Sequence, residues 1–293
     1  MMKHDTTSAS SLPIAVFDSG LGGLTVVRAL RALLPAETIA YFGDTARLPY
    51  GTKSAATVHR FTRQCLGFLM KLTPAPKLLV VACNTASALA LEQLKGEFPV
   101  PVIGVLEPGA TAAVELAGGG HSLRQIGLIA TEATIASGAY PAAVARLDGQ
   151  IHVVSRACPL LVPLIEEGRE PDDPIVRLVL EEYLQPFKQL QVAALILGCT
   201  HYPILAPAIA KVLGAAGGGA TLVDSAQQTA LVVQRQLATM AALNAGGTPG
   251  KLTCYVTDQG QRFERLAGRF LGQPVSQPVW VTPEMLEANS GAT

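Results

Sequence analysis

Two cysteines stand at the ends of short apolar segments and could transfer protons as a pair. Cys83 follows the apolar segment 78–82, and Cys199 follows the segment 193–197 after one glycine. A cysteine between a strand and a helix lies near the positive end of the helix dipole and near free backbone N–H groups, which favour the thiolate and lower its pKa. A single free cysteine is often only a small buried hydrophobic residue. Two cysteines that both end a strand, at equivalent positions of a repeat in the sequence, indicate a functional pair.

This pair of thiols predicts inversion of a carbon centre. One thiolate removes a proton from the carbon, and the other thiol delivers a proton to the opposite face, so the product is the mirror image of the substrate. Each group must work near its pKa and within reach of the reacting carbon. Neither step requires a metal or an organic cofactor, and the sequence shows no motif for either one. We therefore predict an enzyme with no cofactor and no metal site.

Of the other three cysteines, Cys65 and Cys254 are expected to be structural, and for Cys158 both roles stay open with a structural one favoured. Cys65 lies on the apolar face of a predicted helix, Cys254 lies in a late strand, and Cys158 precedes a proline at a strand end. The odd number of cysteines argues against a disulfide framework, and the absence of a C-x-x-C pair argues against a structural zinc site.

Polar side chains follow the same strands and could bind a small acidic substrate. Basic residues there are limited to Arg47 and Lys53, so uncharged donors must hold the substrate carboxylate. Hydroxyl and amide groups come from Ser19, Asn84, Thr85, Thr131, Thr134 and Thr200. Glycines in the segment 19–25 would also let backbone N–H groups approach a carboxylate.

Four ionisable residues could assist the thiols. Asp18 could pair with a substrate ammonium group or relay a proton to the first thiol. His201, two residues after the second thiol, could act as a general base or as a cation. For Asp44 and Glu166 we weigh a capping or surface role equally with a functional one.

Alternating strands and helices position these residues, and the order repeats once along the chain. In the first half, predicted strands at 14–17, 38–42, 78–82 and 100–105 alternate with predicted helices at 25–34, 54–70 and 86–95. Further strands are predicted at 126–129, 151–154, 193–197 and 221–223, and the C-terminal segments 227–242, 251–256 and 261–270 do not repeat. Alternation of this kind is typical of parallel sheets covered by helices, which bind ligands at the carboxyl ends of their strands.

The repeat predicts an α/β protein with two similar domains, each a parallel sheet flanked by helices, and an active site in the cleft between them. Residues 1–107 and 225–293 are expected to form the first domain, because the C-terminal segments return to it. Residues 108–224 are expected to form the second. The polar segment 1–12 is predicted to be a disordered tail.

Composition narrows the classes of function. The chain has 293 residues, of which 49% are hydrophobic and 15% charged, and its formal net charge is zero. High hydrophobicity excludes an intrinsically disordered chain, and the zero net charge argues against nucleic-acid partners. The mean hydropathy is +0.35, but no apolar run approaches the ~18 residues that span a bilayer. With no membrane span and no export signal at the polar N-terminus, we expect a cytoplasmic protein.

A glycine-rich segment raises a competing interpretation. Residues 19–25 follow a predicted strand and precede a helix, and Asp44 lies 24 residues after Gly20, as in a dinucleotide-binding fingerprint. The third glycine of that fingerprint is replaced by Thr25, which disfavours it. A nicotinamide-dependent oxidoreductase stays an alternative, as does a non-catalytic protein that binds small acids, although a binding protein would not need paired cysteines.

Several motifs give the chain a family resemblance. They are VFDSGLGGLTV (16–26), YFGDTARLPYG (41–51), ACNTASA (82–88), IGVLEPG (103–109), CPLLVPLIE (158–166), LGCTHYPIL (197–205) and VDSA (223–226). In these segments the chain resembles the glutamate racemases, cofactor-independent members of the aspartate/glutamate racemase superfamily. His201 in the LGCTHYP segment separates it from aspartate racemases, which typically carry an acidic residue there.

The resemblance implies interconversion of L- and D-glutamate, which supplies D-glutamate for peptidoglycan synthesis. It implies that Cys83 and Cys199 are the acid/base thiols, the first acting on the D-enantiomer and the second on the L-enantiomer. Implied substrate contacts come from Asp18, Ser19, Tyr50, Gly51, Asn84, Thr85, Thr200 and His201, and also from Thr131 and Thr134. Racemisation of aspartate or another acidic amino acid is the alternative within enzymes. Family members are often homodimers, and a homodimer is expected here.

Overall fold

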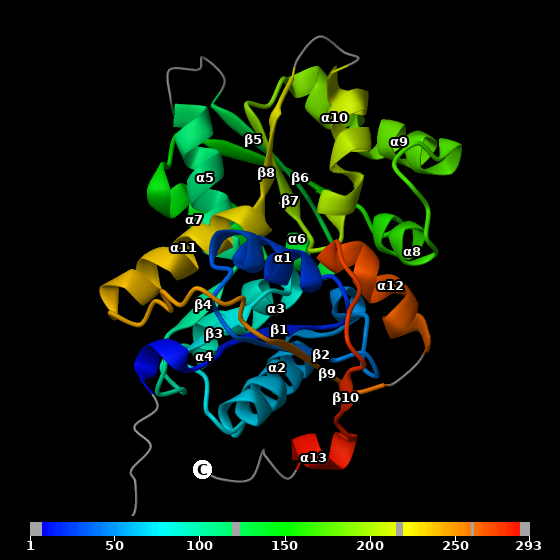
Figure 1. Ribbon diagram of the computed structural model, residues 1–293. Coiled ribbons are helices and arrows are strands. Elements are labelled where there is room, and N and C mark those ends of the chain that lie inside the picture. The colour runs from blue at the N-terminus through cyan, green and yellow to red at the C-terminus, as the bar shows by residue number, and fades with distance from the viewer. Residues whose placement is uncertain (1–7, 119–123, 215–218, 259–260, 288–293) are drawn as a thin grey trace, which may run out of the picture.

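The chain forms two parallel β-sheets flanked by helices in the computed structural model, which is described for residues 8–118, 124–214, 219–258 and 261–287 (Figure 1). The first sheet has the order β10-β9-β2-β1-β3-β4, with β1 Ile14–Asp18, β2 Ile39–Gly43, β3 Leu78–Val81, β4 Val102–Gly104, β9 Leu252–Val256 and β10 Val279–Trp280. The second has the order β6-β5-β7-β8, with β5 Gln125–Ala130, β6 His152–Ala157, β7 Ala194–Gly198 and β8 Thr221–Asp224.

Helices connect these parallel strands. Those associated with the first sheet are α1 Leu24–Leu33, α2 Ala55–Met70, α3 Asn84–Leu89, α4 Leu91–Leu94, α11 Ser225–Thr239, α12 Gln261–Leu271 and α13 Pro283–Glu287. Those associated with the second are α5 Leu106–Gly118, α6 Glu132–Ala136, α7 Ala139–Leu147, α8 Leu161–Glu166, α9 Pro174–Leu190 and α10 Ala206–Gly214. None of the helices in the described ranges combines the length and apolar composition needed to cross a bilayer.

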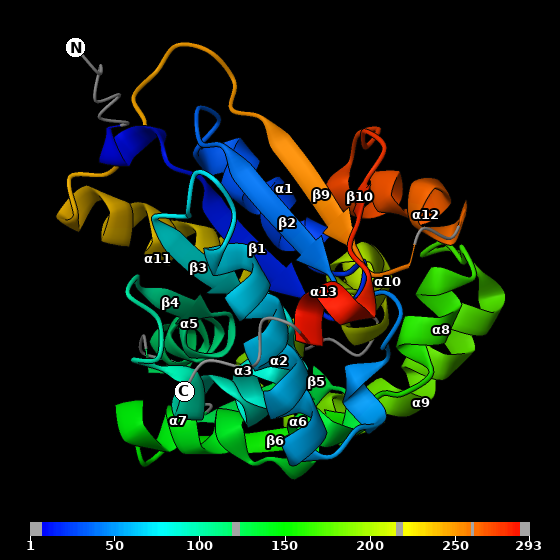
Figure 2. The same cartoon turned by 90° about the horizontal axis from the view of Figure 1, so that it is seen from below.

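Alternating side chains of the first sheet build two apolar cores. Ile14 and Val16 pack on the side of α1, whereas Ala15 and Phe17 pack on the side of α2, because successive residues of a strand point to opposite faces. The core on the α1 side continues into the second sheet, where it includes Leu197. The two sheets are therefore joined through shared hydrophobic packing. Figure 2 shows α2 and α13 lying together beneath the first sheet.

The second sheet is also covered on both faces. Helices α5 and α7 pack on one face around Leu128 and Tyr140. Helices α9 and α10 pack together on the other face, which includes Leu195 and Phe187. Strand β7 is buried along its whole length and consists of apolar residues and a glycine, as expected for a strand that is covered on both sides.

The predicted fold class is confirmed, and two local predictions need correction. The helix predicted at 86–95 is two short helices, α3 and α4, because the backbone leaves helical geometry at Ala90 (φ −124°). In the segment 1–12, residues Ala9–Ser11 form a 3₁₀ turn instead of a disordered tail, and residues 1–7 lie outside the described residues. The domain boundaries stay a prediction, which is supported by the strands that each sheet contains.

A buried ion pair connects the segments that precede β2 and β3, at the amino-terminal ends of these strands. Lys77 Nζ lies 2.6 Å from Glu37 Oε2, and the two side chains are 2% and 1% exposed. The ammonium group also donates to the carbonyl oxygen of Ala242. We expect Lys77→Met to lower the free energy of unfolding by ~3–5 kcal/mol, because it leaves a buried carboxylate without its partner. The exposed pair of Lys95 with Glu92 gives the control, since Lys95→Met should cost about 1 kcal/mol or less. Urea denaturation checks both values, and equal losses would contradict the structural role of the buried pair.

Candidate active site

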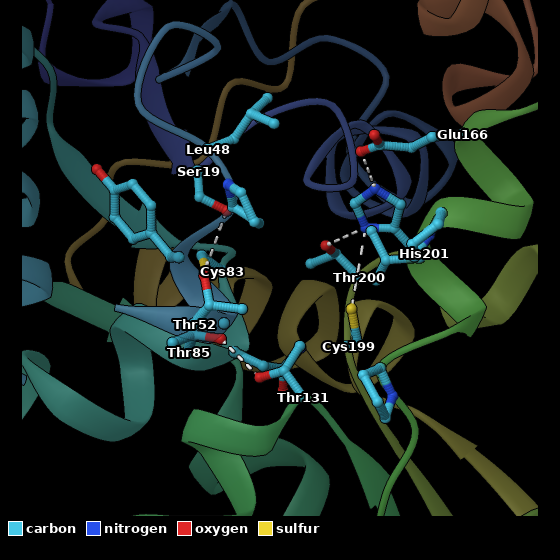
Figure 3. Close-up of a pocket in the computed structure, with 18 of the residues that line it drawn as sticks. Ser19, Leu48, Thr52, Cys83, Thr85, Thr131, Glu166, Cys199, Thr200 and His201 are labelled. Carbon is cyan, nitrogen blue, oxygen red and sulfur yellow. Dashed lines mark hydrogen bonds and ion pairs between the residues drawn. The ribbon is translucent and has the colours of Figure 1, made fainter. Parts of the chain in front are cut away.

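One cavity of about 330 Å³ opens where the carboxyl ends of strands from both sheets meet. Its walls come from loops that follow β1, β2 and β3 of the first sheet and β5, β6 and β7 of the second. The lining residues are Ser19, Gly20, Leu48, Pro49, Tyr50, Gly51, Thr52, Cys83, Asn84, Thr85, Thr131, Glu132, Pro159, Val162, Pro163, Glu166, Glu167, Cys199, Thr200 and His201. Figure 3 shows Cys83 on one wall and Cys199 on another. The two thiols, 116 residues apart in sequence, therefore face one cavity.

Cys83 is held at the junction of β3 and α3. It is the N-cap residue of α3, and its sulfur accepts a hydrogen bond from the Ala86 backbone N–H at 3.5 Å. Its thiol donates to Ser19 Oγ at 3.4 Å. One contact from its own helix and one from the end of β1 thus fix the direction in which this thiol points.

The pKa of Cys83 differs from the expectation. Burial, followed by the charge of Asp18, raises the pKa of this thiol to about 12, although the hydrogen bonds from Ser19 and Ala86 act in the opposite direction. The predicted lowering of the Cys83 pKa at a helix N-terminus is therefore wrong, because desolvation outweighs the N-cap contact. At neutral pH the group is a thiol, the form that donates a proton.

The second thiol belongs to a chain of three side chains. Cys199 Sγ lies 3.9 Å from His201 Nδ1, and His201 Nε2 lies 3.0 Å from Glu166 Oε1. Burial lowers the pKa of His201, but hydrogen bonds and charges from Cys199 and Glu166 outweigh it and raise the pKa to about 10. The imidazole is thus positively charged at neutral pH. It lies where it can hydrogen-bond the sulfur, and Glu166 orients the ring.

This histidine predicts a pH dependence of stability. Because the folded-state pKa lies well above the unfolded value near 6.5, the stabilisation is complete below pH 6.5 and is lost as the pH rises through about 10. The difference in unfolding free energy between the wild type and His201→Gln should therefore shrink across that interval. Urea denaturation at pH 6, 8 and 10 measures it. A difference that stays constant or grows with pH would show that His201 is not held as a cation.

Two predicted carboxylates lie behind the wall of the cavity. Asp18 is 1% exposed, accepts a hydrogen bond from the Gly20 N–H at 2.9 Å, and acts electrostatically on Cys83. Burial raises the pKa of the Asp18 carboxyl, although the charge of His201 opposes the shift. Asp18 thus lies close enough to influence the first thiol without lining the cavity.

Asp44 supports the loop after β2 from behind the wall of the cavity. Its carboxylate accepts hydrogen bonds from Arg47 Nε at 2.7 Å, Tyr50 Oη at 2.5 Å and Thr257 Oγ1 at 3.0 Å. The buried Asp44 therefore fixes the loop that carries Tyr50 and Gly51 to the wall. For Glu166 and Asp44 the sequence leaves a functional role and a capping or surface role equally open; in the structure Glu166 lines the cavity and Asp44 does not.

Threonines from both sheets meet at the floor of the cavity. The Oγ1 atoms of Thr85 and Thr131 lie 3.0 Å apart, and that of Thr134 lies 3.2 Å from Thr85 and 3.0 Å from Thr131. Thr134 lies behind the other two and does not line the cavity. Asn84 Oδ1 accepts a hydrogen bond from Tyr140 Oη at 2.6 Å, which orients its amide.

The sequence analysis missed part of the wall. Leu48, Pro49 and Thr52 flank Tyr50 and Gly51 on the loop after β2, and other missed lining residues are Glu132, Pro159, Val162, Pro163 and Glu167. The segment CPLLVPLIE contributes to the family resemblance, but its apolar residues give no chemical signal. Cys65, Cys158 and Cys254 are buried and do not line this cavity. Among the described residues, no three His, Cys, Asp or Glu side chains gather in a group that could hold a metal ion.

Comparison with known proteins shows the family to which the chain belongs. The sequence model of the Asp/Glu/Hydantoin racemase family matches residues 24–233, which is most of the chain. The chain belongs to this family. Among its relatives in the family, the glutamate racemase of Thermus thermophilus is 48% identical over 263 residues, covering 90% of this chain and 93% of the relative. The glutamate racemase of Chlorobaculum tepidum is 46% identical over 275 residues, covering 93% of this chain and 96% of the relative.

A solved structure shows the same fold. The glutamate racemase of Francisella tularensis, crystallised in complex with D-glutamate, is 38% identical to this family member. The two superpose with a TM-score of 0.85, over 95% of this chain and 99% of that one. The likeness therefore extends over both sheets, including the C-terminal strands and helices that lie beyond residue 233.

Proposed function

We propose that this family member is a glutamate racemase that needs no cofactor and uses Cys83 and Cys199 as its two acid/base groups. The observation that carries the proposal is the placement of two thiols, from two different sheets, on one cavity. The high identity to glutamate racemases over most of the chain supports glutamate as the substrate.

The reaction from L-glutamate is a transfer of two protons. The Cys199 thiolate takes the proton from Cα and becomes a thiol, while the electron pair stays on Cα and spreads into the adjacent carboxylate. The Cys83 thiol then gives its proton to the opposite face of Cα and becomes a thiolate. D-glutamate leaves, and the reverse reaction starts from the Cys83 thiolate. The raised pKa of Cys83 suits the donor role in the first direction.

Polar groups of the cavity can bind the substrate, because N–H and O–H groups can donate to its carboxylates and oxygen atoms can accept from its ammonium group. We assign contacts with the two carboxylates and the ammonium group to residues of the wall: Ser19, Tyr50, Gly51, Asn84, Thr85, Thr131, Thr200 and His201. Asp18 and Thr134 act from behind the wall. Hydrogen-bond donors that are already oriented favour the transition state because they need no reorganisation when charge develops at Cα.

The cellular role follows from the product. D-glutamate made in this way supplies peptidoglycan synthesis and so supports the cell wall and cell shape. We place the protein in the cytoplasm and propose that it is a homodimer, as members of the family often are.

A comparison of substrates tests this function. Protein treated with chelator and freed of small molecules should racemise L-glutamate and D-glutamate, with much slower turnover of L-aspartate. Circular dichroism follows the loss of optical activity. Preference for aspartate would support the alternative racemase, turnover that depends on added nicotinamide would support the oxidoreductase, and binding without turnover would support the non-catalytic alternative.

A further inference from the structure

Helix α12 contacts His201 and the end of α8, the helix that carries Glu166. Figures 1 and 2 show α12, in orange to red, beside α1 and close to α8. Two consecutive residues of α12 make these contacts. Arg269 binds the end of α8, and Phe270 packs on His201. Both residues lie beyond the segment 24–233 that matches the family model.

Helix α12 is anchored on the first sheet. Phe263, Leu266, Ala267 and Leu271 are buried in the core on the α1 side, and α12 packs along α1. The Glu166–His201 pair, in contrast, follows strands of the second sheet. The helix therefore reaches from one sheet to the acid/base machinery of the other.

Arg269 fixes the part of the chain that carries Glu166. Its guanidinium group donates to the carbonyl oxygen of Ile165 at 2.6 Å and to that of Arg169, and it pairs with Glu170 at 3.3 Å. These carbonyl groups stand on both sides of Glu166 at the C-terminal end of α8. A cation is favourable at this negative end of a helix, and the planar fork of arginine fixes direction as well as position.

Phe270 fixes the plane of the imidazole. The ring centroids of Phe270 and His201 lie 4.9 Å apart with an interplanar angle of 79°, which is an edge-to-face contact. Both side chains are buried. Rotation of the histidine ring would break this contact and would turn Nδ1 away from Cys199 and Nε2 away from Glu166.

We propose that Arg269 and Phe270 are positioning residues for the half of the reaction in which Cys199 exchanges a proton with the L-enantiomer. This inference rests on the proposed racemase function. No contact in the described structure joins either residue to Cys83, so the D-specific half-reaction should be independent of them.

Elimination from L- and D-3-chloroglutamate separates the two half-reactions, because it needs only one base. The thiolate removes the Cα proton, that electron pair forms the Cα–Cβ double bond, and chloride leaves with the Cβ–Cl pair. Water then converts the enamine product to 2-oxoglutarate and ammonium. In a Cys83→Ser background the L-form reports on Cys199, and in a Cys199→Ser background the D-form reports on Cys83.

Phe270→Leu is to be introduced into both backgrounds, with Arg269→Lys as a second variant and Arg265→Met, exposed on the same helix, as a control. We expect chloride release from the L-form to fall by roughly tenfold or more, since a misplacement of 1 Å can cost ~10²-fold. Release from the D-form should change by less than about twofold, and the control should change neither rate.

The outcomes separate the positioning role from the racemase itself. Equal slowing of both half-reactions, or no slowing of either, overturns the positioning role and leaves the racemase intact. Failure of both single-cysteine backgrounds to release chloride, before any change in α12, overturns the proposed function and this inference with it. If Phe270→Leu does not fold, Arg269→Lys decides by the same comparison.

Discussion

Serine in place of Cys83 or of Cys199 is expected to lower the rate of glutamate racemisation by ~10²–10⁴-fold, the usual cost of losing a positioned acid or base. Each thiol serves one face of Cα, so neither can replace the other. A serine hydroxyl keeps the shape of the side chain but does not ionise in the working range. Both variants should therefore bind glutamate but invert it only at this lowered rate.

The measurement is the racemisation rate of each variant from both enantiomers. Cys254→Ala is the control, because that buried cysteine lies on β9 away from the cavity, and its rate should stay near that of the wild type. If both serine variants racemised glutamate at nearly the wild-type rate, the assignment of the two thiols would be wrong.

Gly22→Ala is expected to lower the same rate by roughly 10²-fold. A Cβ atom at Gly22 would overlap Thr200 Oγ1 and would lie 2.5 Å from His201 Nδ1, across the junction of the two sheets. The imidazole, whose Nδ1 lies near Cys199, must then shift from its position, and misplacement of 1 Å in such a site costs about this much. The glycine is required here because backbone of the first sheet approaches the second-sheet residues closely.

The matched control is Gly118→Ala, since no atom lies within 4 Å of a Cβ built at that position. Circular dichroism and thermal denaturation should show that both variants fold, so that activity reports on the site. Full activity of Gly22→Ala would mean that the two units are farther apart in the working enzyme than the structure places them.

The alternation of apolar and polar segments predicted the fold well. Buried parallel strands are nearly continuous apolar runs, so the segments that became β1, β3 and β7 were evident from the sequence. Because parallel strands end at one edge of a sheet, it also followed that Cys83 and Cys199 would stand at strand ends beside polar residues.

Features that depend on packing could not be predicted in this way. The pKa of Cys83 rises because burial and Asp18 outweigh the helix N-terminus, and no sequence pattern shows how dry a site is. The position of Asp44 behind the wall depends on contacts with Thr257, more than 200 residues away in sequence. The contact of Phe270 with His201 was hidden for the same reason.

Exchange of the Cα proton in D₂O tests the two-thiol mechanism most directly. Chelator-treated protein, free of small molecules, is incubated with L-glutamate, and NMR follows both enantiomers at early times. We expect the D-glutamate formed first to carry deuterium at Cα, because Cys83 delivers a proton that came from solvent, while the remaining L-glutamate still carries protium. D-glutamate that kept its original proton, or the absence of any exchange, would contradict proton transfer by two thiols on opposite faces.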